Sequence, residues 1–334
     1  MWISLLLASA FAYETDQLTD RQMPLADITG EANAEMDRLL GQAAAEANRR
    51  SRCSGSDAEM ANLLAASVAD AVGGVAKVPP RGDLPTMTFG AYAAWLETAP
   101  LARRTFTDRR DIYGELKVWE NPIIALFGLS STIKLNDTLL GTDKIDHFLV
   151  QGYLYYRRSQ GGLDPFRAMT WGTHTERAHW GQATTGVFSY ADLSANYRGL
   201  RFYAGLMGED GYFTRGADGC VAQDRPFEWA EWVDWTLDEV LNPPVYDAPL
   251  QVRVSAALTT RQDQVCEVWD AGAAPEPQAM AAVLTVPYPY ALGRAPTRVD
   301  PFRLADHCDG TTDIAPAEVA PVERTRAARR ARAR

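Results

Sequence analysis

Two polar stretches decide this fold: GTDKIDHF at residues 141–148 and SYADLSANYRG at residues 189–199. Each carries two polar residues four positions apart, Asp143 with His147 and Asp192 with Asn196. Residues four apart lie on one face of an α-helix. Because the stretches are otherwise largely apolar or aromatic, we expect these polar side chains to point inward, where they need hydrogen-bond partners.

The residues around the two stretches predict three successive helices. We expect the first from about Asp143 to Arg158, the second from Pro165 to about Gly181, and the third after Ser189, a residue type that caps helix N-termini. Helices joined by short connections most often pack as antiparallel neighbours, which would bring their inward faces together. The expected fold class is mainly α, with a helical bundle at about 141–206, long irregular flanks and disulfides.

Other segments add helices to this centre. Residues 31–73 are rich in alanine and predict two helices, with Cys53 in the break between them. Residues 75–88 contain three prolines and predict a linker. Residues 226–241 predict an amphipathic helix rich in tryptophan and carboxylates. Such a helix either lines a sugar-binding groove or packs its tryptophans into the core, and the general burial of large aromatic residues favours the core.

The polar residues of the three helices suggest acid–base chemistry. His147 is the natural acid–base group, because histidine is the residue type that serves this role near neutral pH, and Asp143 one turn earlier could orient its ring. Lys144 could neutralise the cluster or bind an anion. The predicted catalytic set comprises Asp143, His147, Glu176, Asp192 and Asn196. A divalent metal is also possible, with His147, Glu176 and Asp192 as candidate ligands. The alternative is a buried polar network that only fixes how the helices dock.

Several common catalytic motifs are excluded. His174 and His179 resemble the zinc-protease pattern H-E-x-x-H, but they are one residue too far apart. On a helix they would be separated by about 140°, so they cannot bind one ion from one face. The sequence also lacks the G-x-S-x-G elbow, the P-loop and the G-x-G-x-x-G pattern.

The order of these residues resembles that of the VanZ-like proteins and of a related group of periplasmic proteins. The shared order is Asp-Lys-x-x-His-Phe from Asp143, then Glu176, then Asp-x-x-x-Asn-x-x-Gly from Asp192, all within residues 141–200. VanZ-like proteins are small helical membrane proteins linked to glycopeptide-antibiotic resistance. The resemblance implies a helical centre that carries these residues. Since the helices here are shorter and less apolar, membrane insertion is not carried over.

The N-terminus predicts export. Residues 1–12 form an apolar run that ends in Ala-Phe-Ala, an A-x-A cleavage pattern after which the mature chain would begin at Tyr13. The alternative is a buried N-terminal helix. Residues 13–314 are expected to form a single mainly helical domain. Residues 315–334 hold six arginines and two glutamates among alanines and prolines, and predict a disordered basic tail.

Cysteine usage is consistent with a periplasmic or secreted location. Four widely spaced cysteines, without a C-x-x-C motif, suit two structural disulfides whose connectivity is open: Cys53, Cys220, Cys266 and Cys308. If the protein is cytosolic, they would instead be free buried thiols.

Composition narrows the class of partner. With 46% hydrophobic residues the chain can bury a sizeable core, and after residue 12 no apolar run approaches the roughly 20 residues that span a bilayer. A net charge of -10 argues against nucleic acid as the main ligand. The leading hypothesis is an exported enzyme, hydrolytic in type, that acts on the cell envelope. The alternative is a non-catalytic protein that binds an envelope glycan or lipid.

Overall fold

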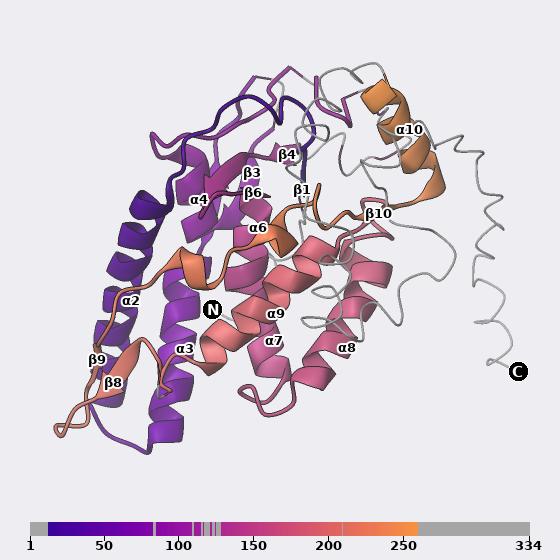
Figure 1. The fold of residues 1–334 in the computed structure, drawn as a ribbon. Helices are drawn as coiled ribbons and strands as arrows, with labels where there is room; N and C mark the ends of the chain where they lie inside the picture. The colour runs from indigo at the N-terminus through magenta and orange to yellow at the C-terminus, as the bar shows by residue number, and fades with distance from the viewer. Residues whose placement is uncertain are drawn as a thin grey trace, which may run out of the picture.

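Helices make up most of the regular structure in this computed structural model (Figure 1). The structure describes residues 13–82, 85–108, 110–114, 116, 121, 124, 128–208 and 210–259. Within these ranges the prediction of a mainly α protein is confirmed, and no helix has the length and apolar character needed to cross a bilayer. The predicted signal segment, the predicted basic tail, Cys266, His307 and Cys308 lie outside the described residues.

The two alanine-rich helices form as predicted and pack against each other: α2 (Thr29–Ser51) and α3 (Asp57–Gly73). A capping box starts α3, because the Ser56 hydroxyl accepts from the Glu59 N–H while the Glu59 side chain accepts from the Ser56 N–H. Cys53 lies in the connection and forms a disulfide with Cys220, with Cα atoms 4.4 Å apart. This bridge fixes the hairpin of β8 (Phe213–Arg215) and β9 (Val221–Gln223), which lies beside α2 (Figure 1).

Short strand pairs connect the helices. They are β1 (Glu14–Thr15) parallel to β4 (Leu129–Ser130), and four antiparallel pairs: β2 (Val75–Val78) with β3 (Met87–Gly90), β5 (Thr132–Leu135) with β6 (Thr138–Gly141), β7 (Val187–Phe188) with β10 (Val245–Tyr246), and β8 with β9. The predicted linker therefore contains part of a hairpin, which leads into α4 (Ala91–Thr98). The β5–β6 turn uses Asn136 and Asp137 with positive φ, as two-residue hairpin turns require.

The central helices match the prediction, with one addition. The first consists of α6 (Thr142–Asp146), the π-helical turn η1 (His147–Gln151) and α7 (Gly152–Arg158). The second consists of α8 (Pro165–Thr175) and the π-helical turn η2 (Glu176–Trp180), and the third is α9 (Tyr190–Ala204). The expected N-cap is confirmed, since the Ser189 hydroxyl accepts from the Asp192 N–H at 3.1 Å. Each π-helical turn begins at a predicted site residue.

Two glycines let α7 and α9 touch. A Cβ atom on Gly152 would lie 2.5 Å from the Cα of Gly199, and one on Gly199 would lie 1.9 Å from the Phe148 carbonyl oxygen. Any larger residue would push the two helices apart. Phe148 continues the contact into an aromatic core with Phe202 and Trp229.

The predicted tryptophan-rich helix over 226–241 is wrong. The segment forms two isolated 3-10 turns, η3 (Trp229–Glu231) and η4 (Trp235–Leu237). The Asp234 carboxylate accepts from the Thr236 N–H, and the Asp238 carboxylate accepts from the Val240 N–H. Such local side-chain acceptors compete with helical hydrogen bonds, and the chain turns instead of continuing the helix. Trp229 is nevertheless fully buried, as the core interpretation expects.

The last described element is α10 (Ala248–Thr259), which follows β10 at the end of the described chain (Figure 1). It packs Leu250, Val254 and Leu258 into a second apolar cluster with Ile112 and Tyr246. Val240 and Tyr246, from the segment that follows η4, belong to the same cluster.

Candidate functional site

Lys144 is the centre of the polar cluster. Its ammonium nitrogen lies 2.6 Å from Asp143 Oδ2, 2.6 Å from Asp192 Oδ1 and 2.7 Å from Glu239 Oε1. The side chain is fully buried. The ammonium donates a hydrogen bond to Asp143 and contacts Asp192 and Glu239 as ion pairs. Of the two roles considered for Lys144, this geometry supports neutralisation of the cluster.

The first β-strand pair holds Asp143. Its Oδ1 accepts from the Thr15 hydroxyl at 2.6 Å and from the Ser130 hydroxyl at 2.9 Å. Thr15 and Ser130 are register partners in β1 and β4. Burial acts to raise the pKa of Asp143, but the charges of Lys144 and His147 outweigh it and the pKa is lowered. Asp143 is therefore the firmly ionised partner of Lys144.

His147 is held at both ring nitrogens. Nε2 lies 3.2 Å from Asp192 Oδ2, and Nδ1 lies 3.0 Å from Asn196 Oδ1. These two contacts fix the orientation of the imidazole ring. The Asn196 amide in turn donates to the Tyr155 hydroxyl at 3.3 Å. His147 does not belong to the lining of the pocket described below; its contacts lead to the pocket residue Glu239 through Asp192 and Lys144.

Glu176 joins the cluster indirectly. Its Oε1 accepts from the Ser189 N–H at 3.2 Å, and the Ser189 hydroxyl donates to Glu239 Oε1 at 3.0 Å. Gly181 makes this possible, since a Cβ there would lie 2.2 Å from Glu176 Oε1. Burial, with repulsion from Asp192, raises the pKa of Glu176 well above its ordinary value.

The predicted residues thus converge in part. Asp143, His147, Asp192 and Asn196 form one hydrogen-bonded and ion-paired cluster with Lys144, whereas Glu176 is attached through Ser189. Asp143, His147 and Asp192 each offer a ligand atom within 4.8 Å of the others, so this group could hold a metal ion. Lys144 already supplies a positive charge between the two aspartates, and a metal ion would have to share them with it.

Two further carboxylates belong to the cluster without carrying a sequence motif. Burial, with repulsion from Asp143 and Asp192, raises the pKa of Glu239 to about 7, although Lys144 opposes the shift. Burial and repulsion from Glu239 also raise the pKa of Glu14 well above its ordinary value. In the sequence, Glu239 is distinguished only by its place among the tryptophans and carboxylates of residues 226–241. No sequence pattern distinguishes Glu14 from the other polar residues around it.

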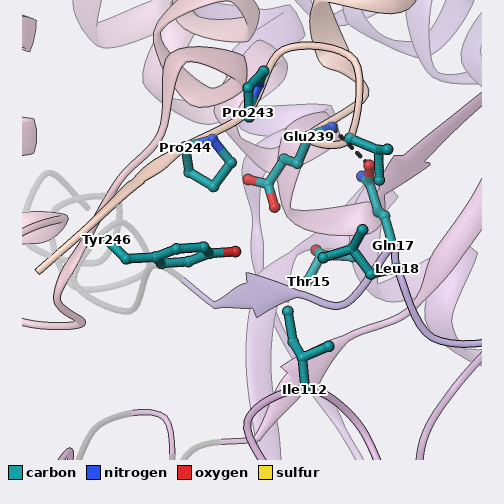
Figure 2. Close-up of a pocket in the computed structure, with 9 residues that line it drawn as sticks. Thr15, Gln17, Leu18, Ile112, Glu239, Pro243, Pro244 and Tyr246 are labelled. Carbon is teal, nitrogen blue, oxygen red and sulfur yellow. Dashed lines mark hydrogen bonds between the residues drawn. The ribbon is translucent and has the colours of Figure 1, made fainter. Parts of the chain in front are cut away.

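A small pocket borders this cluster (Figure 2). It encloses about 310 Å³ with its open mouth included, and its lining comprises Thr15, Gln17, Leu18, Ile112, Glu239, Val240, Pro243, Pro244 and Tyr246. Figure 2 shows the Glu239 carboxylate directed between Pro244, Tyr246 and Thr15. Glu239 is the only carboxylate in this lining, so it connects the pocket with Lys144.

Hydrogen bonds at Asp238 and at the Glu239 backbone fix the segment that bears Glu239. Gln17 Oε1 accepts from the Glu239 N–H at 2.7 Å. Arg21 donates two hydrogen bonds to the Asp238 carboxylate, at 3.2 and 2.6 Å. Because a forked arginine–carboxylate pair restricts geometry at both ends, the Glu239 carboxylate is held in place relative to the pocket.

Comparisons with known proteins give no relative: no family model matches the chain, and neither the curated proteins nor the solved structures contain a match. The site is therefore interpreted from its own geometry.

Proposed function

We propose that this protein is a hydrolase in which Glu239 is the acid–base group. The observation that carries the proposal is that one carboxylate lines the pocket, contacts the buried Lys144 and has its pKa raised to about 7. A group with a pKa near the working pH is the most effective proton donor and acceptor. The predicted set of Asp143, His147, Glu176, Asp192 and Asn196 would then position and tune Glu239, with the helices over 141–206 as their frame.

Lys144 allows Glu239 to change its charge. When Glu239 is ionised, it shares the positive charge of Lys144 with Asp143 and Asp192. When Glu239 is protonated, the two aspartates still pair with the ammonium. Neither state leaves a buried cation without a partner, which would be costly. The cluster can therefore support both halves of a proton-transfer cycle.

The proton balance of hydrolysis needs only this one carboxyl group. Ionised Glu239 takes a proton from water as the water oxygen bonds to the electrophilic carbon of the substrate. The bond from that carbon to the leaving heteroatom breaks, and protonated Glu239 returns the proton to the heteroatom. Glu239 ends in its starting state. We propose a neutral ester or amide of the cell envelope as the substrate, because one carboxyl group can serve both water and leaving group at an acyl carbon and the many carboxylates near the pocket disfavour anions. We also propose a periplasmic or secreted location, supported by the apolar run of residues 1–12 and by the Cys53–Cys220 disulfide.

Turnover of simple chromogenic substrates tests the proposal. We expect the protein to release nitrophenol from a neutral p-nitrophenyl ester, but not from p-nitrophenyl phosphate. Glu239→Gln should lower kcat at least about 100-fold, the usual contribution of general acid–base catalysis. The rate should follow a group with a pKa of about 7. Full activity of Glu239→Gln, or turnover of the phosphate alone, would rule out this role.

The full burial of Lys144 supports a second candidate, a non-catalytic binding protein in which the cluster only fixes the helices. The two candidates differ in what His147→Ala and Glu239→Gln should do. If the cluster is structural, both variants lower the free energy of unfolding, by about 3–5 kcal/mol where a buried charge loses its partner. If Glu239 is catalytic, Glu239→Gln stays folded with an unchanged circular dichroism spectrum and loses activity.

A further inference from the structure

Gln17 carries a buried hydrogen-bond donor without a protein partner. The residue is 2% exposed, and its Oε1 is used by the Glu239 N–H. Its Nε2 has no hydrogen-bond partner among the residues that the structure describes. Leaving a buried donor unsatisfied costs free energy, so such groups usually have a ligand or water partner. Gln17 lines the same pocket as Glu239, and Figure 2 shows its amide group on the side of the Glu239 carboxylate.

Gln17 and Glu239 together present a donor beside an acceptor. The bond from the Glu239 N–H to Gln17 Oε1 fixes the orientation of the amide, so Nε2 is the part of the group left for a ligand. Glu239 offers carboxylate oxygens at the pocket. A group that accepts one hydrogen bond and donates another therefore complements the pair. Carboxamides and hydroxyls have this chemistry.

The charge around the pocket excludes anions. Glu239 itself lines the pocket, and the charges of Asp143 and Asp192 act on it. Glu14 interacts electrostatically with Lys144, which Glu239 contacts. Lys144 is fully buried and its charge is already paired with three carboxylates, so it offers little to an incoming anion. The remaining walls combine apolar residues, Pro243, Pro244 and Leu18 among them, with the uncharged residues Thr15 and Tyr246.

We infer that this pocket binds a neutral carboxamide or hydroxyl group, whose oxygen accepts from Gln17 Nε2 and whose N–H or O–H donates to Glu239. The pocket thus selects uncharged polar groups. This inference deepens the proposed function, because it names the class of group that reaches Glu239. Its test measures binding and does not need turnover.

Nuclear magnetic resonance titration tests the inference, because Gln17 has its own side-chain NH₂ signal. The loss of this signal in Gln17→Met assigns it. Three probes of similar size, acetamide, ethanol and acetate, separate the two neutral groups from an anion. We expect saturable shifts of the Gln17 NH₂ signal with acetamide or ethanol, with a dissociation constant on the order of 10 mM, as for small fragments. Acetate should cause none.

Gln223, the last residue of β9, provides the internal control, because its Nε2 is already used in a hydrogen bond to Asp37 of α2 at 2.6 Å. Its NH₂ signal should not move. Gln17→Glu keeps an acceptor for the Glu239 N–H but lacks the donor, so we expect it to stay folded and to lose at least about 10-fold in affinity for the neutral probe. The inference is overturned if neither neutral probe shifts the Gln17 signal, if acetate shifts it equally, or if folded Gln17→Glu binds as wild type.

The outcomes also separate this inference from the proposed hydrolase. Binding of a neutral probe without any turnover supports the pocket and contradicts the catalytic role of Glu239. Turnover that depends on Glu239, without shifts at Gln17, supports the hydrolase and contradicts the binding role of Gln17. If acetamide binds and ethanol does not, the group is a carboxamide, and the reverse result identifies a hydroxyl.

Discussion

Replacing Lys144 with methionine tests whether the cluster depends on a single cation. Methionine fills a similar volume without charge, and it leaves Asp143, Asp192 and Glu239 without their shared partner. Breaking a buried ion pair by removing one side costs about 3–5 kcal/mol, because the remaining charge is uncompensated. We expect the free energy of unfolding of Lys144→Met to fall by this amount at about pH 7.

The loss should depend on pH, and its sign follows from proton binding. Without Lys144, the folded protein keeps protons on these carboxylates to higher pH than the unfolded chain does. Stability is therefore retained at low pH and lost as pH rises through the raised folded-state pKa values. One carboxylate contributes about 1.4 kcal/mol per pH unit, so the deficit should grow by roughly 3 kcal/mol between pH 5 and 7.

Urea denaturation of both proteins, followed by tryptophan fluorescence at several pH values, measures this deficit. Lys134→Met is the matched control, because Lys134 pairs with the exposed Asp137 at 2.8 Å on the β5–β6 turn. Such a surface pair contributes at most about 1 kcal/mol. A Lys144→Met protein within about 1 kcal/mol of wild type at every pH would refute the view that Lys144 neutralises the cluster.

Two further substitutions test other buried features. Burial raises the pKa of Asp146 to about 7, although the Gly90 N–H donates to its carboxylate. The stability that protonated Asp146 contributes is present below about pH 4 and is lost by about pH 7. We therefore expect Asp146→Asn to raise the free energy of unfolding by about 2–4 kcal/mol at pH 8 and to leave it unchanged at pH 4. Urea denaturation at the two pH values measures this difference. Gly199→Ala should lower the free energy of unfolding by at least about 1–3 kcal/mol, because the added methyl group would overpack against Phe148. Gly41→Ala, which has open space in α2, should raise it by about 0.5–1 kcal/mol. Equal melting temperatures of the two variants would contradict the close α7–α9 contact.

Local sequence patterns were sufficient for the parts of the site that lie on helices. The four-residue spacings of Asp143 with His147 and of Asp192 with Asn196 placed these side chains on facing helices, and the structure brings them together. Ser189 was recognisable as an N-cap because its chemistry acts on the next turn of the same helix.

The rest of the site depends on contacts distant in sequence. Glu14, Gln17 and Glu239 lie on a two-residue strand or in irregular segments, where no periodicity shows which way a side chain points. For Glu239 the helical spacing of the tryptophans was misleading, because Asp234 and Asp238 bind nearby backbone N–H groups instead. The pocket arises from the meeting of residues 15–18 with residues 239–246, which only the tertiary fold decides.

The π-helical turn η1 sets the registration between two facing helices. His147 and Gly152 are five residues apart, which in an ideal α-helix would put them about 140° apart around the axis. Both nevertheless face α9, where their partners Asn196 and Gly199 are only three residues apart. The Gly152 N–H donates to the His147 carbonyl oxygen, and this wider ring takes up the additional residue. An α-helix with one residue fewer would put the histidine and the glycine four positions apart, which is also one face. The π-helical turn thus accommodates an additional residue while His147 still contacts Asn196 and Gly152 still contacts Gly199.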